Sequence, residues 1–201
     1  MRGLYLVTPD WADTDRLLAV TDQALKAGAA LVQYRNKAAA PELRREQAAA
    51  LLVLCRRHGR PLVINDHLDL CLALDADGVH VGGSDVPVAA VRAALGPSKI
   101  VGASCYGEFA LARAAEDAGA SYVAFGGFYP SRVKVYEVST SPQIVARAKV
   151  QLRVPVVVIG GMTVENARPL VDLGADMVAA ISSVYLAEDP FAAAREFTTL
   201  F

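Results

Sequence analysis

The chain has 201 residues, of which 54% are hydrophobic and 20% are charged, and its formal net charge is −1. This length is typical of a single domain, residues 1–201, with a substantial core. The hydrophobic fraction favours strands that are buried on both faces. The small net charge excludes a general basic surface for nucleic acid or acidic membrane, so any affinity for phosphate must be local.

The cysteines Cys55, Cys71 and Cys105 are odd in number and match no metal-ligand spacing. We interpret them as free thiols in a reducing cytoplasm. The amino terminus enters an apolar strand directly, without the longer apolar region and cleavage site of a signal peptide. No apolar run approaches the roughly 18 residues of a membrane span. The sequence does not give the oligomeric state and leaves a homodimer open.

Short apolar, β-branched runs alternate with Ala- and Leu-rich segments of helical periodicity. Strands are predicted over Leu4–Thr8, Ala30–Arg35, Leu62–Asn65, Gly78–Val81, Ile100–Ser104, Tyr122–Phe125, Val156–Ile159 and Met177–Ile181. Helices are predicted over Thr14–Lys26, Pro41–Arg57, His67–Leu74, Val88–Leu95, Glu108–Ala118, Ser141–Gln151, Thr163–Leu173 and Pro190–Phe201. Pro41 suits a first helical turn, and Thr163 suits a helix cap.

Strict alternation of strands and helices implies parallel strands joined by right-handed crossovers. Eight such units predict an α/β fold consisting of one closed (β/α)₈ TIM barrel, at the small end of its size range. The alternative is an open, doubly wound sheet. Two observations speak against it: the first helix lacks a Gly-rich dinucleotide turn, and polar residues follow nearly every strand.

A polar stretch begins just past the apolar part of the second strand, with Gln33, Arg35 and Lys37. Their alternate spacing in an extended segment sends all three to one side. The planar fork of Arg suits phosphate oxygens, whereas Lys acts as a mobile point charge. A solvated loop charge with a surface arginine is the alternative. It is disfavoured because Gln33 and Arg35 belong to an otherwise apolar strand.

Two carboxylates follow the next two strands: Asp66, after Asn65, and Asp85, in the turn beyond His80. Either could merely cap the helix that follows. On adjacent barrel strands they could also converge on one Mg²⁺, which favours one or two carboxylates with waters and phosphate oxygens. His80 is interpreted as a hydrogen-bonded wall residue, because no second histidine is spaced to join it as a ligand.

Ser104 ends the fifth strand, and no histidine follows that could act as its base, so we expect it to bind substrate instead of acting as a nucleophile. The long irregular segment after the sixth strand, 126–139, holds Ser131 and Lys134 and is typical of a functional loop. A mobile surface lysine is the alternative for Lys134.

Glycines and serines follow the last two strands, at Gly160-Gly161 and Ile181-Ser182-Ser183. Loops after strands seven and eight form the recurrent phosphate site of this barrel. Two anion sites are therefore predicted. One is cationic and flanked by carboxylates, and the other is neutral. This combination favours an enzyme that joins two phosphorylated small molecules, with a metal-bound diphosphate as leaving group.

The sequence resembles the thiamine-phosphate synthase family over nearly its whole length. The motifs that carry the resemblance are Val32-Gln33-Tyr34-Arg35-Asn36-Lys37, Ile64-Asn65-Asp66, Asp77-Gly78-Val79-His80-Val81-Gly82 with Asp85, Gly102-Ala103-Ser104, Ile159-Gly160-Gly161 and Ile181-Ser182. The resemblance implies a transferase of thiamine biosynthesis. An aminopyrimidine diphosphate loses diphosphate by a dissociative route, and the nitrogen of a thiazole phosphate then attacks the pyrimidine-methyl cation.

The resemblance also implies roles for individual residues. Asp66 and Asp85 would hold Mg²⁺ on the diphosphate, and Gln33 and Ser104 would orient the pyrimidine. The diphosphate would be neutralised by Arg35, Lys37, Asn65 and Lys134. The thiazole substrate and its phosphate would be received by Ser131, Gly161, Ile181 and Ser182.

The chain departs from the family mainly after the sixth strand, where Val133 replaces a usual Thr and Val135–Val138 replaces a Gly/Ala/Pro-rich stretch. Gly83 also stands where Gln is common. Two alternatives stay open. One is the related thiazole tautomerase, which needs no diphosphate site and would be expected to carry an acid–base histidine near the end of the fifth strand, where this chain has Ser104-Cys105-Tyr106. The other is a non-catalytic binder of thiamine metabolites. A lysine Schiff-base aldolase is disfavoured, because Lys37 and Lys134 lie in polar loop segments.

Overall fold

The computed structural model describes residues 1–82, 86–130 and 140–201. Within these ranges each of eight strands is followed by a helix, and the last strand is followed by two. The strands are β1 (Gly3–Val7), β2 (Leu31–Tyr34), β3 (Leu62–Asn65), β4 (Gly78–Val81), β5 (Ile100–Tyr106), β6 (Tyr122–Gly126), β7 (Val156–Ile159) and β8 (Met177–Ala180). The helices are α1 (Thr14–Lys26), α2 (Pro41–Arg57), α3 (Leu68–Leu74), α4 (Val88–Leu95), α5 (Phe109–Asp117), α6 (Gln143–Gln151), α7 (Val164–Asp172), α8 (Ser182–Tyr185) and α9 (Pro190–Thr198).

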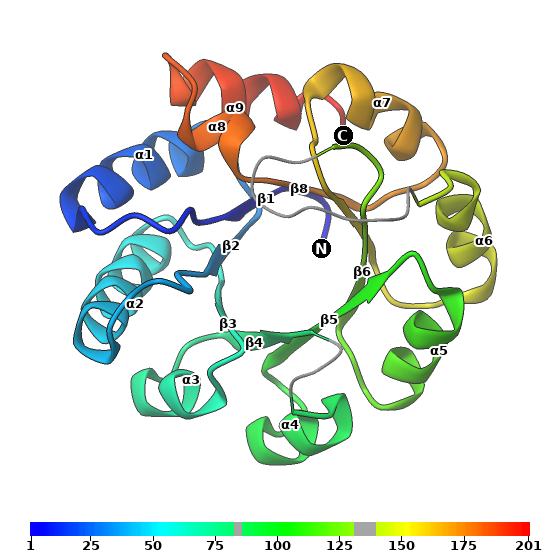
Figure 1. Ribbon diagram of the computed structural model, residues 1–201, viewed down its shortest axis with the longest axis horizontal. Coiled ribbons are helices and arrows are strands. Elements are labelled where there is room, and N and C mark those ends of the chain that lie inside the picture. Colours follow the sequence, from blue (N-terminus) through cyan, green and yellow to red (C-terminus); the bar gives the residue numbers. More distant parts are fainter. Residues whose placement is uncertain (83–85, 131–139) are drawn as a thin grey trace.

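The strands close into a parallel barrel in chain order, and the helices form a ring around it (Figure 1). Closure depends on the pairing of β1 with β8, in which Gly3 aligns with Met177 and Leu6 with Ala180. An open sheet would leave both of these strands as edges. The predicted (β/α)₈ barrel is therefore confirmed, and the open-sheet alternative is wrong.

The strands are buried on both faces, as the composition predicts. Side chains alternate along each strand, so one set points into the barrel and the other points toward the helices. Leu4, Leu6 and Val32 are fully buried in the layer shared with the helices. The barrel interior is filled by Tyr5, Val7, Leu31, Val63, Tyr122, Ala124, Val157, Met177 and Ala179.

Local signals fix several helix ends. Pro41 is the first residue of α2, as predicted. Thr163 caps α7 in a reciprocal pair with Asn166: the Thr163 hydroxyl accepts from the Asn166 N–H, and the Asn166 side chain accepts from the Thr163 N–H. This capping box satisfies two N–H groups that have no partner within the helix.

The structure departs from the predicted elements chiefly at α8. The strand β8 ends at Ala180 because the chain turns into this four-residue helix at Ser182. Four residues are too few to show helical periodicity, so the sequence pattern did not reveal it. None of the helices in the described ranges is long and apolar enough to cross a membrane.

Candidate active site

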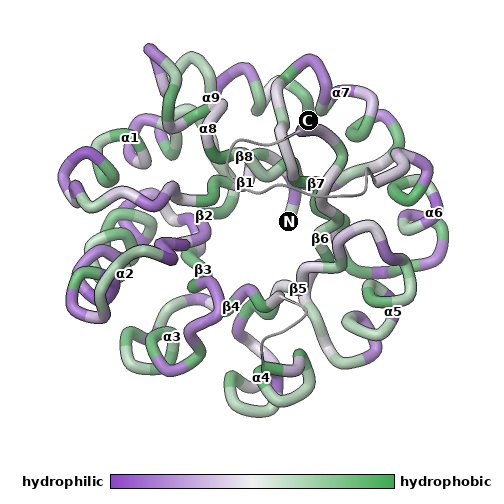
Figure 2. Tube along the Cα trace, viewed as in Figure 1, coloured by the Kyte–Doolittle hydropathy of each residue, from purple (hydrophilic) through white to green (hydrophobic). Residues whose placement is uncertain are grey.

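The carboxyl ends of the strands bring most of the predicted site residues to one end of the barrel. Gln33 stands one residue before the end of β2, and Asn65 is the last residue of β3. Each follows an inward residue by two positions, Leu31 and Val63 respectively, and therefore also faces the interior. Figure 2 shows hydrophilic segments bordering the barrel near β2, β3 and β4. At this part of the mouth, polar residues at the strand ends border an interior filled largely by the apolar residues of the strands.

A continuous chain of hydrogen bonds crosses the barrel between Gln33 and Ser104. Gln33 Nε2 donates to the Tyr5 hydroxyl at 2.5 Å, and the Tyr5 and Tyr122 hydroxyls lie 2.6 Å apart. His80 then joins the Tyr122 hydroxyl through Nδ1 at 2.9 Å and Ser104 Oγ through Nε2 at 2.8 Å. The two residues expected to orient one ligand are thus connected through side chains of β1, β6 and β4.

Gly102 makes room for the Tyr122 ring in this chain. A Cβ atom at position 102 would lie 2.1 Å from Tyr122 Cζ, well inside any real contact. In the barrel register Gly102 lies between His80 on one side and Tyr122 on the other. The His80 and Tyr122 rings stack across it, with centroids 5.7 Å apart. Any side chain at position 102 would therefore displace the tyrosine from its partners.

The two tyrosines of this hydrogen-bond chain, Tyr5 and Tyr122, are protonated at neutral pH. Both side chains are fully enclosed, and burial raises the pKa of Tyr5 and of Tyr122 well above the ordinary value. Each hydroxyl therefore keeps its proton and can donate one hydrogen bond.

No histidine follows Ser104 in the sequence, but one that precedes it, His80, lies within hydrogen-bond distance of it in the structure. His80 lies 24 residues before Ser104 in the chain, but β4 and β5 are neighbours and both side chains face the interior. His80 uses its other nitrogen on the Tyr122 hydroxyl and not on a carboxylate. This differs from the usual Ser-His-Asp arrangement, so the pair gives no support to a nucleophilic Ser104. The interpretation of His80 as a hydrogen-bonded wall residue is confirmed.

Arg35 is held at the rim by a carboxylate that the sequence analysis missed. Arg35 Nη1 contacts both oxygens of Asp10, at 3.1 and 3.2 Å. Asp10 also accepts from the backbone N–H of Lys37 at 2.8 Å. The Thr8 hydroxyl bonds both backbone groups of Arg35, each at 2.8 Å. Asp10 lies in the loop after β1, and Asp66 directly follows β3, so polar residues beyond a strand end were a usable signal for both.

Lys37, Asn65 and Asp66 come together as predicted. Lys37 Nζ lies 3.6 Å from Asp66 Oδ2, and Asn65 Nδ2 donates to the same oxygen at 2.6 Å. Asp66 has a φ of 62°, a left-handed conformation that costs a non-glycine residue about 1 kcal/mol or more. Such strain clusters at functional sites, and here it occurs at the strand end.

The interpretation of Asp66 as a mere helix cap is wrong. The helix α3 begins at Leu68, and its cap residue is His67, with no side-chain hydrogen bond at the cap. Asp66 instead contacts Lys37 and Asn65 at the rim. Its carboxylate therefore belongs to the mouth of the barrel.

Several predicted residues cannot be placed. Asp85, Ser131 and Lys134 lie outside the described residues, as do Gly83 and the Val133–Val138 stretch. Over the ranges that are described, no group of three or more His, Cys, Asp or Glu side chains gathers to hold a metal. The predicted Asp66–Asp85 pair therefore stays a prediction.

A small cavity of about 30 Å³ lies at the carboxyl ends of β7 and β8. Gly161, Ile181 and Ser182 all line it, so the structure brings these three predicted residues together. Gly161 has a φ of 61°, and a Cβ there would lie 2.3 Å from the Pro130 carbonyl oxygen. Only glycine fits this close approach of two backbones.

The helix α8 begins at this cavity. Ser183 Oγ donates to the Met162 carbonyl at 2.7 Å, which ties the start of the helix to the β7–α7 loop. At its end, the Tyr185 hydroxyl bonds Thr21 Oγ1 of α1 at 2.8 Å. A short extra helix after β8 is a recurrent part of phosphate sites in this fold.

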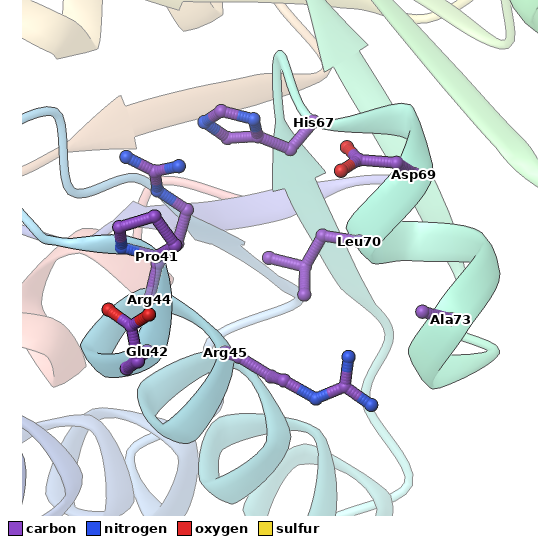
Figure 3. A pocket seen from close by; sticks show the side chains of 8 residues that line it. All are labelled: Pro41, Glu42, Arg44, Arg45, His67, Asp69, Leu70 and Ala73. Carbon is purple, nitrogen blue, oxygen red and sulfur yellow. The ribbon is translucent and has the colours of Figure 1, made fainter.

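A larger groove of about 280 Å³ lies between α2 and α3, lined by Pro41, Glu42, Arg44, Arg45, His67, Asp69, Leu70 and Ala73 (Figure 3). It contains none of the predicted site residues, and its charged side chains are of both signs. We therefore place the candidate site at the barrel mouth, where the predicted site residues lie, although the cavity there is smaller than this groove.

A sequence profile of the family described as thiamine monophosphate synthase matches residues 4–184. The chain belongs to this family. The thiamine-phosphate synthase of Janthinobacterium sp. (strain Marseille) is 64% identical over 201 residues, covering 100% of this chain and 97% of the relative. That of Methylobacillus flagellatus is 49% identical, covering 100% and 96%. The predicted family and its transferase activity are confirmed.

One solved structure supports this family assignment, and a second shares the fold. Thiamine phosphate pyrophosphorylase from Pyrococcus furiosus superimposes with a TM-score of 0.85 at 32% identity, covering 98% of this chain and 94% of that one. A 3-hexulose-6-phosphate synthase superimposes with a TM-score of 0.74 at 21% identity over the full length of both chains. The second likeness shows the fold alone.

Proposed function

We propose that the barrel mouth carries out the thiamine-phosphate synthase reaction with a pyrimidine diphosphate over β2–β4 and a thiazole phosphate over β7–β8. The observation that carries this proposal is the division of the mouth. Arg35, Lys37, Asn65 and Asp66 gather on one side, and a neutral cavity that includes Gly161 and Ser182 lies at the other. A charged diphosphate suits the first, and a phosphate monoester bound by N–H and O–H groups suits the second.

Magnesium fits the described donor set in part. Asp66 offers one carboxylate at the rim, and Asp85 would supply the second. Mg²⁺ is commonly bound by one or two carboxylates together with waters and substrate phosphate oxygens, so this number of ligands is sufficient. When bound, the ion would neutralise charge on the departing diphosphate.

The residues of the chain would act by positioning and electrostatics. The bond between the pyrimidine methylene carbon and the diphosphate oxygen breaks, and its electron pair leaves with the diphosphate. Arg35, Lys37 and Lys134 would stabilise the negative charge that grows there. The thiazole nitrogen then donates its lone pair to the methylene carbon. No general base is needed, because that nitrogen carries no proton that would have to be removed first.

Ligand recognition would be shared by the two sides of the mouth. Gln33 and Ser104 would orient the pyrimidine, because both face the interior near the carboxyl ends of β2 and β5. Ser131, Gly161, Ile181 and Ser182 would receive the thiazole phosphate. Neither the tautomerase nor the non-catalytic binder gains a supporting observation from the described residues, and the compared relatives are named as synthases.

We also propose a reducing, cytoplasmic location. Cys55, Cys71 and Cys105 are free, as predicted, and all three are buried. Burial raises the pKa of Cys71 to about 11, so the thiol stays protonated and unreactive at neutral pH. Free thiols of this kind are typical of proteins from reducing compartments.

Purified protein given both substrates and Mg²⁺ should release diphosphate. The variant Asp66→Asn should lower kcat/KM on the order of 100-fold, because the amide keeps the shape of the side chain but removes its charge. Asp75→Asn is the matched control: Asp75 also has a left-handed φ, of 53°, and a lysine partner, Lys99, at 2.5 Å. Equal activities for the two variants, or no diphosphate release by the wild type, would contradict the proposal.

A further inference from the structure

The hydrogen-bond chain beneath the mouth has a direction. An amide nitrogen only donates, so the Tyr5 oxygen must accept from Gln33 Nε2. The single Tyr5 proton is then directed to the Tyr122 oxygen, 2.6 Å away. The Tyr122 proton is directed in turn to His80 Nδ1, at 2.9 Å. Each hydroxyl therefore accepts one hydrogen bond and donates one, and all the donors point in the same direction, from Gln33 toward His80.

The direction fixes the tautomer of His80. With Nδ1 accepting, a neutral imidazole carries its proton on Nε2 and donates it to Ser104 Oγ at 2.8 Å. The Ser104 proton is then directed away from His80, toward the mouth. At the opposite end, the Nε2 group of Gln33 is engaged, so its Oε1 is the atom presented to a ligand. One end of the chain offers an acceptor and the other offers a donor.

Burial keeps this arrangement in place. Gln33 is 4% exposed, His80 7%, Tyr5 1% and Tyr122 0%. Water does not compete for these groups. If Tyr122 donated to Tyr5 instead, the Tyr5 oxygen would accept twice and its own proton would be left without a partner in the buried interior, unless Gln33 turned its Oε1 toward it. The packing of Tyr122 against Gly102 holds its hydroxyl at the crossing point between Tyr5 and His80.

We propose that Tyr5, Tyr122 and His80 form a directional relay that sets Gln33 as acceptor and Ser104 as donor, so that the mouth selects a pyrimidine bearing an amino group over one bearing a carbonyl oxygen. The inference rests on the proposed function and deepens it by naming what determines pyrimidine choice. The amino group donates to Gln33 Oε1, and a ring nitrogen accepts from the Ser104 hydroxyl. An oxo-pyrimidine would instead bring its oxygen against Oε1, which cannot donate.

The test compares amino- and oxo-pyrimidine diphosphates as substrates of the wild type and of Tyr5→Phe. The phenylalanine removes the acceptor that holds Gln33 Nε2, so the amide is free to rotate. We expect the ratio of kcat/KM between the two substrates to fall at least tenfold. Tyr34→Phe is the matched control, because Tyr34 adjoins Gln33 but faces outward, where its hydroxyl donates to Gln47 Oε1 at 3.0 Å. It should leave the ratio unchanged.

A second measurement needs neither substrate nor variant activity. The chain has three histidines, and ¹⁵N NMR of the histidine-labelled wild type should show His80 protonated on Nε2 alone, assigned by the signals lost in His80→Asn. In Tyr122→Phe, the signals should shift toward a mixture of tautomers. Protonation of His80 on Nδ1 in the wild type would overturn the relay, even if Tyr5→Phe failed to fold.

The two proposals fail separately. A wild type inactive with both pyrimidines would overturn the proposed function, and substrate selection with it. An active enzyme whose Tyr5→Phe variant keeps the wild-type preference would overturn the relay alone. A lower preference in Tyr5→Phe, with an Nε2-protonated His80, supports both.

Discussion

Two glycines with nearly the same φ differ in what surrounds them: one lies at the candidate site and the other lies in open space. Gly161 has a φ of 61° and lies beside the Pro130 carbonyl. Gly59 has a φ of 62°, but a Cβ atom there would meet nothing within 4 Å. Both conformations disfavour a side chain by roughly 1–2 kcal/mol. Only Gly161 adds a collision at the phosphate-side cavity.

We therefore expect Gly161→Ala to raise KM for the thiazole phosphate about tenfold and to lower the free energy of unfolding by about 2–3 kcal/mol, because backbone strain and the collision add. Gly59→Ala should lower stability by only about 1–2 kcal/mol and leave KM unchanged. Steady-state kinetics and urea unfolding of both variants measure this. A KM that rises equally in the two would contradict a specific role for Gly161.

At the scale of elements, Arg92 joins two loops, α4–β5 and α5–β6, at the amino-terminal end of the barrel. Arg92 is in α4, and its guanidinium donates to three carbonyls and one hydroxyl, those of Gly96, Lys99, Gly119 and Ser121. These groups lie at the end of α4, before β5, after α5 and before β6. The contacts satisfy loop carbonyls on the face opposite the predicted site.

Arg92→Met should lower the free energy of unfolding by about 2–3 kcal/mol, because charge-assisted hydrogen bonds to four partly buried acceptors are lost. Activity below the melting temperature should not change, since the site lies at the other end of the strands. The exposed Arg57 of α2 provides the control, Arg57→Met. Urea unfolding and an activity assay of both variants test this prediction. An Arg92→Met variant that is as stable as the wild type but inactive would contradict it.

Between helices α1 and α2, Asp22 links Lys26 and His58, at 2.6 and 2.7 Å. The hydrogen bond from Lys26 is the largest cause that holds the pKa of Asp22 below its usual value, and the bond to His58 adds to it. Because the folded pKa is depressed, the pair stabilises the fold above the unfolded pKa of about 4. This contribution is lost as the pH falls through the folded pKa.

Asp22→Asn should therefore lower the free energy of unfolding at pH 7 by less than about 1 kcal/mol, since the pair is partly solvated. The difference from the wild type should shrink steadily below about pH 4. Urea unfolding at a series of pH values measures it. A difference that stays constant into the acid range would show that Asp22 acts through packing instead of charge.

At the scale of the whole molecule, closure joins the two ends of the chain. The strands β1 and β8 pair directly, and the ring of Trp11, after β1, meets the ring of Tyr185, on α8, edge to face with centroids 5.6 Å apart. Neither terminal region can detach without opening the barrel. We propose that residues 1–201 form one cooperative domain.

Unfolding should then be a single transition with coincident midpoints for two probes. Trp11 is the only tryptophan in the chain, so its fluorescence reports closure of the barrel, whereas far-ultraviolet circular dichroism reports the helices. Urea titrations followed by both signals provide the measurement. If the fluorescence changed well before the dichroism, the chain would contain more than one unfolding unit.

The sequence alone determined the alternation of elements and the chemistry at their ends. Strand and helix patterns are local, so periodicity and turn residues placed most elements within one or two positions. Gln33, Arg35, Asn65, Asp66 and Gly161 were found because each stands where an apolar strand ends, and parallel strands share that end. The four-residue α8 escaped because it is shorter than the period that would reveal it.

The tertiary structure alone decided which side chains meet across the barrel. The hydroxyls of Tyr5 and Tyr122 touch although 117 positions separate them, and His80 reaches Ser104 only because β4 and β5 are neighbours. Both tyrosines read as ordinary strand residues in the sequence, since the pattern shows which face a side chain takes but not its partner. Those partners depend on closure and register, which are set by the packing of all eight strands at once.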